Sequence, residues 1–286
     1  MDRALPQLPG VAHRHVDAGG LRVHIAQAGT GDPLVLQHGW PQHWLAWRKL
    51  IPSLAESYRV ICPDLRGLGW TEAPPEGYEK EQLASDLLAL LDSLELERVR
   101  LVGHDWGGFA AFLACLRAPE RFERFCCLSI PTPWMRISRS PLAFARTAYQ
   151  PLIASPGLGR RVVPRFVPLL MKKGSGDRRP WTDEELASFV DQFREGDRAE
   201  ASSQIYRTFL RRELNPILKG RYADARLTVP TLLMYGEEDP VINAERLGPW
   251  QEHADDMRVE EIPGAAHFLP EEVPDAVLEH LVPFLR

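Results

Sequence analysis

The sequence alternates short segments of strand character with longer segments whose apolar residues recur at helical spacing. The segments of strand character are residues 33–37, 58–63, 99–102, 125–130, 231–235 and 258–262. The helical segments are residues 81–94, 109–117 and 272–285. Buried strands that alternate with amphipathic helices are typical of a mostly parallel sheet with helices on both faces. We therefore predict an α/β fold, with a further strand at residues 21–28 that pairs with residues 13–17.

Residues 131 to about 222 interrupt this alternation, because they contain helical segments and no clear buried strand. We predict that residues 1–130 and 226–286 form two parts of one α/β core. Residues 131–225 would form a helical cap inserted between two strands. Such a cap would lie over the carboxyl edge of the sheet, where open α/β sheets bind their ligands.

The composition excludes several classes of protein. The formal net charge of −5 is spread along 286 residues without a long block of one sign, which argues against nucleic acid as a partner. No apolar run reaches the roughly 18 residues that span a bilayer. The first twenty residues lack the apolar segment of a signal peptide. We therefore expect a soluble, cytoplasmic protein with no membrane span.

The cysteines show neither a Cys-x-x-Cys pair nor a Cys/His metal-binding spacing. They are Cys62, Cys115, Cys126 and Cys127. Buried, reduced thiols are common in intracellular proteins, and we expect these four to be of that kind. The sequence therefore predicts neither a metal site nor an organic cofactor.

A turn rich in glycine, Gly103-His104-Asp105-Trp106-Gly107-Gly108, joins the strand at residues 99–102 to a helix. This is the strand–turn–helix context of a nucleophile elbow, with Asp in the place of the usual Ser. Side chains at Gly103 and Gly107 would collide with the neighbouring strand and helix. A carboxylate is already ionised near neutral pH, so Asp105 needs no base to attack a saturated carbon. We predict that Asp105 is a nucleophile.

The same turn allows a plainer interpretation. Asp is a favoured helix N-cap, so Asp105 could serve only to cap the helix that follows. The flanking glycines and the preceding apolar strand favour the nucleophile. We expect His104 to be a structural residue beneath the turn.

A second loop, His38-Gly39-Trp40-Pro41, follows the strand at residues 33–37. The backbone N–H groups of Trp40 and Trp106 are candidates for an oxyanion hole that stabilises a tetrahedral intermediate. Pro41 is a candidate for a cis peptide bond.

Two residues near the carboxyl ends of the last strands complete a catalytic set. His267 lies in a loop of small residues and would act as the general base for water. Asp239 follows the strand at residues 231–235 and would orient the imidazole of His267, with Glu238 as the second choice. The chain order of nucleophile, acid and histidine agrees with this assignment.

These residues together resemble the epoxide hydrolases of the α/β-hydrolase superfamily, from about Leu21 to the end of the chain. The resemblance rests on residues 38–41, residues 103–108, Asp239 and His267. It implies the α/β-hydrolase fold and the conversion of an epoxide and water to a vicinal diol through an aspartyl ester. The substrate would be a small, apolar epoxide.

The resemblance also implies two cap tyrosines that hydrogen-bond the epoxide oxygen and protonate it. Tyr149 and Tyr206 stand in sequence contexts similar to the two sites, and Tyr222 is a weaker substitute. The cap is otherwise poorly matched to the family, so the resemblance does not define the shape of the substrate. Assembly as a homodimer is left open.

Other functions share part of this pattern. Haloalkane dehalogenases use the same Asp–His–Asp set and hold the halide with an indole corresponding to Trp106, but they usually carry Asn at the position of Trp40. Fluoroacetate dehalogenases clamp a carboxylate with arginines just after the nucleophile, where this chain has Phe109, Ala110 and Ala111. A non-catalytic ligand-binding protein of the same fold is the remaining alternative.

Overall fold

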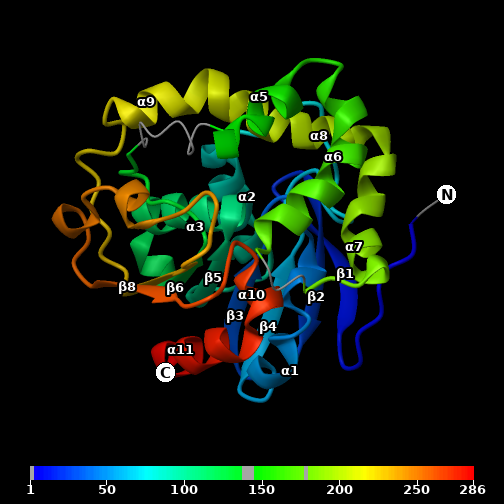
Figure 1. Cartoon of the computed structure of the whole chain (residues 1–286). Helices are drawn as coiled ribbons and strands as arrows, with labels where there is room; N and C mark the ends of the chain where they lie inside the picture. Colours follow the sequence, from blue (N-terminus) through cyan, green and yellow to red (C-terminus); the bar gives the residue numbers. More distant parts are fainter. Residues whose placement is uncertain (1–2, 137–144, 177–179) are drawn as a thin grey trace.

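One eight-stranded sheet forms the centre of the computed structural model, which describes residues 3–136, 145–176 and 180–286 (Figure 1). The strand order is β1-β2-β4-β3-β5-β6-β7-β8. The strands are β1 (Ala12–Ala18), β2 (Leu21–Ala28), β3 (Asp32–Gln37), β4 (Tyr58–Pro63), β5 (Val99–His104), β6 (Phe122–Leu128), β7 (Thr231–Gly236) and β8 (Met257–Ile262).

The directions of the strands confirm the predicted α/β fold. Strand β2 is antiparallel to both β1 and β4, while β4, β3, β5, β6, β7 and β8 run parallel to one another. Several predicted boundaries were wrong. Strand β6 begins at Phe122 and not at Phe125, and the predicted helix at residues 272–285 begins at Pro274, after the separate short helix Leu269–Glu272. Strand β6 ends at Leu128 and not at Ile130, because the backbone turns at Ser129, whose φ is 48°.

Helices cover both faces of the sheet, as Figure 1 shows. The core helices are α1 (Ile51–Leu54), α2 (Lys80–Ser93), α3 (Asp105–Arg117), α10 (Leu269–Glu272) and α11 (Pro274–Leu285). Helices α2 and α3 pack against each other on one face, and α11 contacts β6 from the other. Helix α3 begins four residues earlier than the apolar periodicity predicts, because its first turn contains the small residues Gly107 and Gly108.

A group of helices joins β6 to β7 and lies across one end of the sheet, in green and yellow in Figure 1. These are α5 (Tyr149–Ala154), α6 (Gly159–Gly174), α7 (Asp183–Val190), α8 (Gly196–Thr208) and α9 (Leu214–Leu218). A π-helical turn, Phe209–Glu213, connects α8 to α9. The described residues between β6 and β7 form no strand. Residues 137–144 and 177–179 of the predicted cap lie outside the described residues.

The core beneath these helices is apolar. All four cysteines are buried and free, and burial raises the pKa of each thiol. Within the described ranges, no helix combines the length and the apolar character that crossing a bilayer requires.

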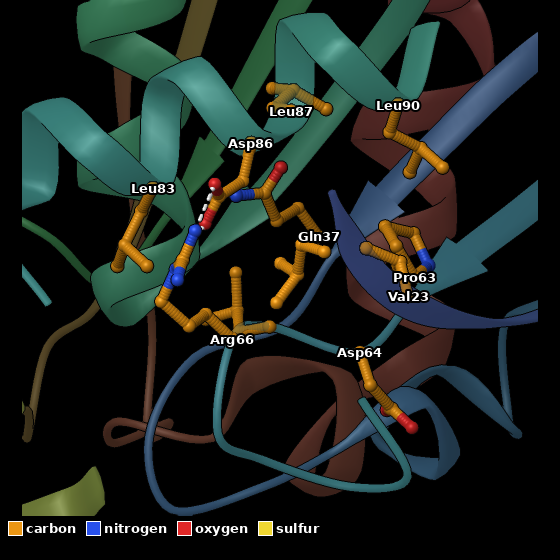
Figure 2. Close-up of a pocket in the computed structure, with 11 residues that line it drawn as sticks. Val23, Gln37, Pro63, Asp64, Arg66, Leu83, Asp86, Leu87 and Leu90 are labelled. Atoms are coloured by element: carbon orange, nitrogen blue, oxygen red, sulfur yellow. Dashed lines mark hydrogen bonds and ion pairs between the residues drawn. The ribbon is translucent and has the colours of Figure 1, made fainter. Parts of the chain in front are cut away.

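A small cavity of about 20 Å³ lies between the sheet and α2, with Gln37, Asp64 and Leu87 among its lining residues (Figure 2). Arg66 and Asp86 form an ion pair at its edge, with N–O distances of 2.6 and 2.7 Å. The cavity has room for about one water molecule and is too small for an organic substrate.

Candidate active site

Asp105 is the first residue of α3 and follows β5 directly. Its φ of 48° is unusual for a residue with a side chain and marks the strained turn of an elbow. A Cβ atom at Gly103 would lie 2.6 Å from Cα of Gly108, and one at Gly107 would lie 2.0 Å from the carbonyl oxygen of His38. The glycines therefore allow the strand, the turn and the neighbouring loop to approach one another closely.

The carboxylate of Asp105 faces the loop after β3 and the histidine loop. Its Oδ1 accepts a hydrogen bond of 2.8 Å from the backbone N–H of Trp40, and its Oδ2 lies 3.6 Å from Nε2 of His267. His104 occupies the N-cap position of α3, and Asp105, the first residue of the helix, directs its carboxylate to Trp40 and His267. The N-cap interpretation of Asp105 is therefore wrong.

His267 lies between two carboxylates. Its Nδ1 is 2.9 Å from Oδ2 of Asp239, while its Nε2 faces Asp105. The other oxygen of Asp239 accepts the backbone N–H groups of Val241 and Ile242 at 2.7 and 2.9 Å, which fixes the carboxylate. Burial lowers the pKa of His267, but the two neighbouring carboxylates outweigh this effect and raise it to about 10.

The two candidate oxyanion-hole groups belong to a residue hydrogen-bonded to Asp105 and to the residue that follows it in the chain. Trp40 already donates its backbone N–H to Asp105. Trp106 is the second residue of α3, where a backbone N–H has no acceptor within the helix. The Trp40–Pro41 peptide bond is cis.

Helices α5 and α8 bring Tyr149 and Tyr206 together above this site. Their ring centroids are 5.9 Å apart, and their hydroxyl groups interact with each other. The indole of Trp40 packs against both rings, with centroid distances of 6.4 Å to Tyr149 and 5.0 Å to Tyr206. Burial is the largest cause that raises the pKa of both phenols, and the charge of Asp105 adds to it. Both hydroxyls therefore keep their protons at neutral pH.

Three residues named from the sequence do not join this group. His104 is buried, and its Nε2 lies 2.9 Å from the backbone oxygen of His267, as a structural role requires. Glu238 is exposed, and it is Asp239 that contacts His267. The hydroxyl of Tyr222 donates to Glu81 at 2.7 Å.

Two residues that support the site were not identified from the sequence. The carboxylate of Glu272 accepts the backbone N–H groups of Ala266 and Phe268, the two neighbours of His267, at 2.7 and 2.6 Å. The indole N–H of Trp40 donates to the hydroxyl of Ser202 on α8 at 3.0 Å. Glu272 lies five residues after His267 and could have been suspected from that spacing. The contact to Ser202 spans 162 positions and leaves no local signal.

The site uses no group of metal ligands. The described residues include no cluster of three or more His, Cys, Asp or Glu side chains that could hold a metal ion. What the arrangement offers chemically is a carboxylate nucleophile, a histidine paired with a carboxylate, two N–H donors and two phenol donors.

Comparison with known proteins places this geometry in a family. The family model described as alpha/beta hydrolase fold matches residues 32–274. The chain belongs to the α/β hydrolase fold family. The resemblance to epoxide hydrolases expected from the sequence is also confirmed, because relatives with that name align along nearly the whole chain.

One such relative is the soluble epoxide hydrolase of Corynebacterium sp. (strain C12), which is 30% identical over 96% of this chain and 97% of its own length. The solved structure titled epoxide hydrolase CorEH without ligand has a TM-score of 0.84 and 30% identity, and covers 96% of this chain and 98% of its own. Cfl2 from Burkholderia cenocepacia has a TM-score of 0.88 and 25% identity, with 99% of each chain covered.

Proposed function

We propose that this α/β hydrolase converts an epoxide and water to a vicinal diol through a covalent ester on Asp105. The observation that carries the proposal is the position of the Asp105 carboxylate. It lies between a backbone N–H donor and His267, beneath a pair of protonated tyrosines. The indole and phenol rings around it favour an apolar epoxide.

In the first half-reaction, Oδ2 of Asp105 attacks a carbon of the epoxide ring. A new carbon–oxygen bond forms as the bond from that carbon to the ring oxygen breaks. The electron pair of the broken bond goes to the ring oxygen, which takes a proton from Tyr149 or Tyr206. Because Trp40 holds Oδ1, Oδ2 is the oxygen free to attack.

In the second half-reaction, His267 removes a proton from water, and the resulting hydroxide attacks the carbonyl carbon of the ester. The negative charge develops on the oxygen that the N–H groups of Trp40 and Trp106 can stabilise. Asp239 stabilises the imidazolium that forms at His267. Collapse of the tetrahedral intermediate breaks the ester bond. The departing alkoxide takes the proton of the added hydroxide, which releases the diol and leaves Asp105 as a carboxylate. The proton on His267 then returns to the phenolate left by the first half-reaction, which restores the tyrosine.

Two substitutions test this proposal with styrene oxide as the probe. Asp105→Ala should abolish turnover, because no other nucleophile lies at the elbow. His267→Gln should let the ester accumulate, so that intact-protein mass spectrometry detects the enzyme plus one substrate. Absence of that adduct from the His267→Gln protein would contradict the proposal.

Haloalkane dehalogenation is a second candidate, favoured by one observation. The indole Nε1 of Trp106 is buried and has no well-formed hydrogen bond within the described part of the chain, although it interacts with the hydroxyl of Tyr206. Such a donor suits a halide leaving group. The tyrosine pair favours the epoxide, because a departing halide needs no proton. A panel of epoxides and haloalkanes, scored for diol and for halide release, distinguishes the two, and turnover of either excludes a purely ligand-binding role.

A further inference from the structure

Lys80 is a buried cation that the proposed mechanism does not use. It is the first residue of α2, and its side chain has no exposed surface. Its Nζ lies 2.9 Å from Oε2 of Glu213, 2.8 Å from the carbonyl oxygen of Ile205 and 3.3 Å from that of Tyr78. All three N–H donors of the ammonium group are therefore accounted for.

Glu213 binds Lys80 in two places. One of its oxygens accepts Nζ, and the other accepts the backbone N–H of Lys80 at 2.7 Å. Glu213 ends the π-helical turn that follows α8, and it is almost fully buried. Single π-helical turns are rare and often occur at functional sites. The pair thus attaches the end of α8 to the start of α2 in the core.

The ammonium group contacts the proposed catalytic residues through their immediate neighbours. Ile205, whose carbonyl it binds, precedes Tyr206 in α8. Nζ also lies 4.7 Å from the ring centroid of Trp106, and the Trp106 ring lies 5.9 Å from that of Tyr206. One buried charge therefore holds both the backbone beside the proton donor and the ring beside the nucleophile.

We propose that Lys80, held by Glu213, is a positioning residue that sets Tyr206 against Asp105 for the ring-opening step. Stability alone is a poor reason for this pair, since well-packed apolar residues often replace a buried ion pair at no cost. A directional hydrogen bond to the carbonyl of Ile205 is something that an apolar pair could not supply. The proposal rests on the proposed function.

The test removes both charges together, because Lys80→Met alone would leave Glu213 buried and unpaired. The double variant Lys80→Met/Glu213→Gln keeps the side-chain volumes and an acceptor for the backbone N–H. Its matched control is Arg66→Met/Asp86→Asn, which removes a largely buried ion pair that also involves α2, shown in Figure 2.

The measurement is the rate at which styrene oxide alkylates Asp105, followed by mass spectrometry in the His267→Gln background. We expect the Lys80/Glu213 double variant to lose about 10- to 100-fold, part of the ~10²–10⁴ that a well-placed acid contributes. The Arg66/Asp86 control should stay within about threefold. Lys80→Gln/Glu213→Gln, a neutral pair that can still hydrogen-bond, should show a smaller loss in the same direction and replaces the first double variant if that one does not fold.

The same alkylation rate, measured in proteins that also carry Tyr206→Phe, shows whether the loss caused by the Lys80/Glu213 variant depends on the hydroxyl of Tyr206. If Lys80 acts by placing that hydroxyl, removing the hydroxyl first should abolish the further loss, because the two changes are then not additive. An alkylation rate that does not fall, or a fall of the same size with Phe at 206, would overturn the inference. Absence of any adduct while Lys80 and Glu213 are native would instead overturn the proposed function.

Discussion

At the scale of single residues, charge decides when His267 can act as a base. With Asp105 and Asp239 both ionised, the pKa of His267 is raised to about 10, so the free enzyme holds an imidazolium against its nucleophile. Esterification neutralises Asp105 and removes one of the two charges. The pKa of His267 then falls, so the imidazolium can lose its proton and the neutral imidazole is present at the step that needs a base.

This cycle predicts the pH dependence of ester hydrolysis. The decay rate of the ester should rise with pH as His267 loses its proton, and it should level off below pH 10, because the ester no longer carries the charge of Asp105 that helps to raise the pKa of His267. Rapid-quench mass spectrometry of the pre-formed ester at a series of pH values measures this rate. Asp239→Asn should move the inflection to lower pH and reduce the plateau. A decay rate that is constant or falls with pH would contradict the assignment of His267.

The tyrosine pair leads to a second prediction at this scale. Tyr149→Phe and Tyr206→Phe should each lower kcat/KM for an epoxide by about tenfold or more, and the double variant should lose most of the ~10²–10⁴ expected of acid catalysis. Tyr222→Phe is the matched control, because its hydroxyl binds Glu81. Unchanged kinetics in the double variant would show that the leaving oxygen takes its proton elsewhere.

At the scale of elements, the site depends on how closely β5, α3 and the loop after β3 approach one another. Trp40 links this loop to the helices above, because its backbone binds Asp105 and its side chain binds Ser202 on α8. A change in the spacing of these elements therefore affects the nucleophile and the proton donors together.

Gly107 provides the test of this close packing. Gly107→Ala should lower the free energy of unfolding by about 1–3 kcal/mol or more, since its Cβ would lie 2.0 Å from the carbonyl oxygen of His38. Gly196→Ala is the control, because a Cβ there meets nothing within 4 Å and Ala favours helix. Urea unfolding compares the two variants, and equal stability of both would refute the packing argument.

At the scale of the whole molecule, the sequence predicts those features that depend on residues close together in the chain. Strand β2 matches its predicted bounds, because its turns and apolar residues are local signals. Asp105, His267 and Asp239 were predicted from short motifs at the ends of strands. The π-helical turn and the pair between Lys80 and Glu213 could not be predicted, because their partners lie 133 positions apart and meet only after α8 packs onto the core.

The origin of the oxygen in the product tests the covalent mechanism most directly. In a single turnover in ¹⁸O-labelled water, with enzyme in excess over styrene oxide, the oxygen that opens the ring comes from Asp105. We therefore predict a diol without ¹⁸O and a peptide containing Asp105 that has gained the label. A first diol that carries one ¹⁸O atom, with Asp105 unlabelled, would mean that water attacks the epoxide directly.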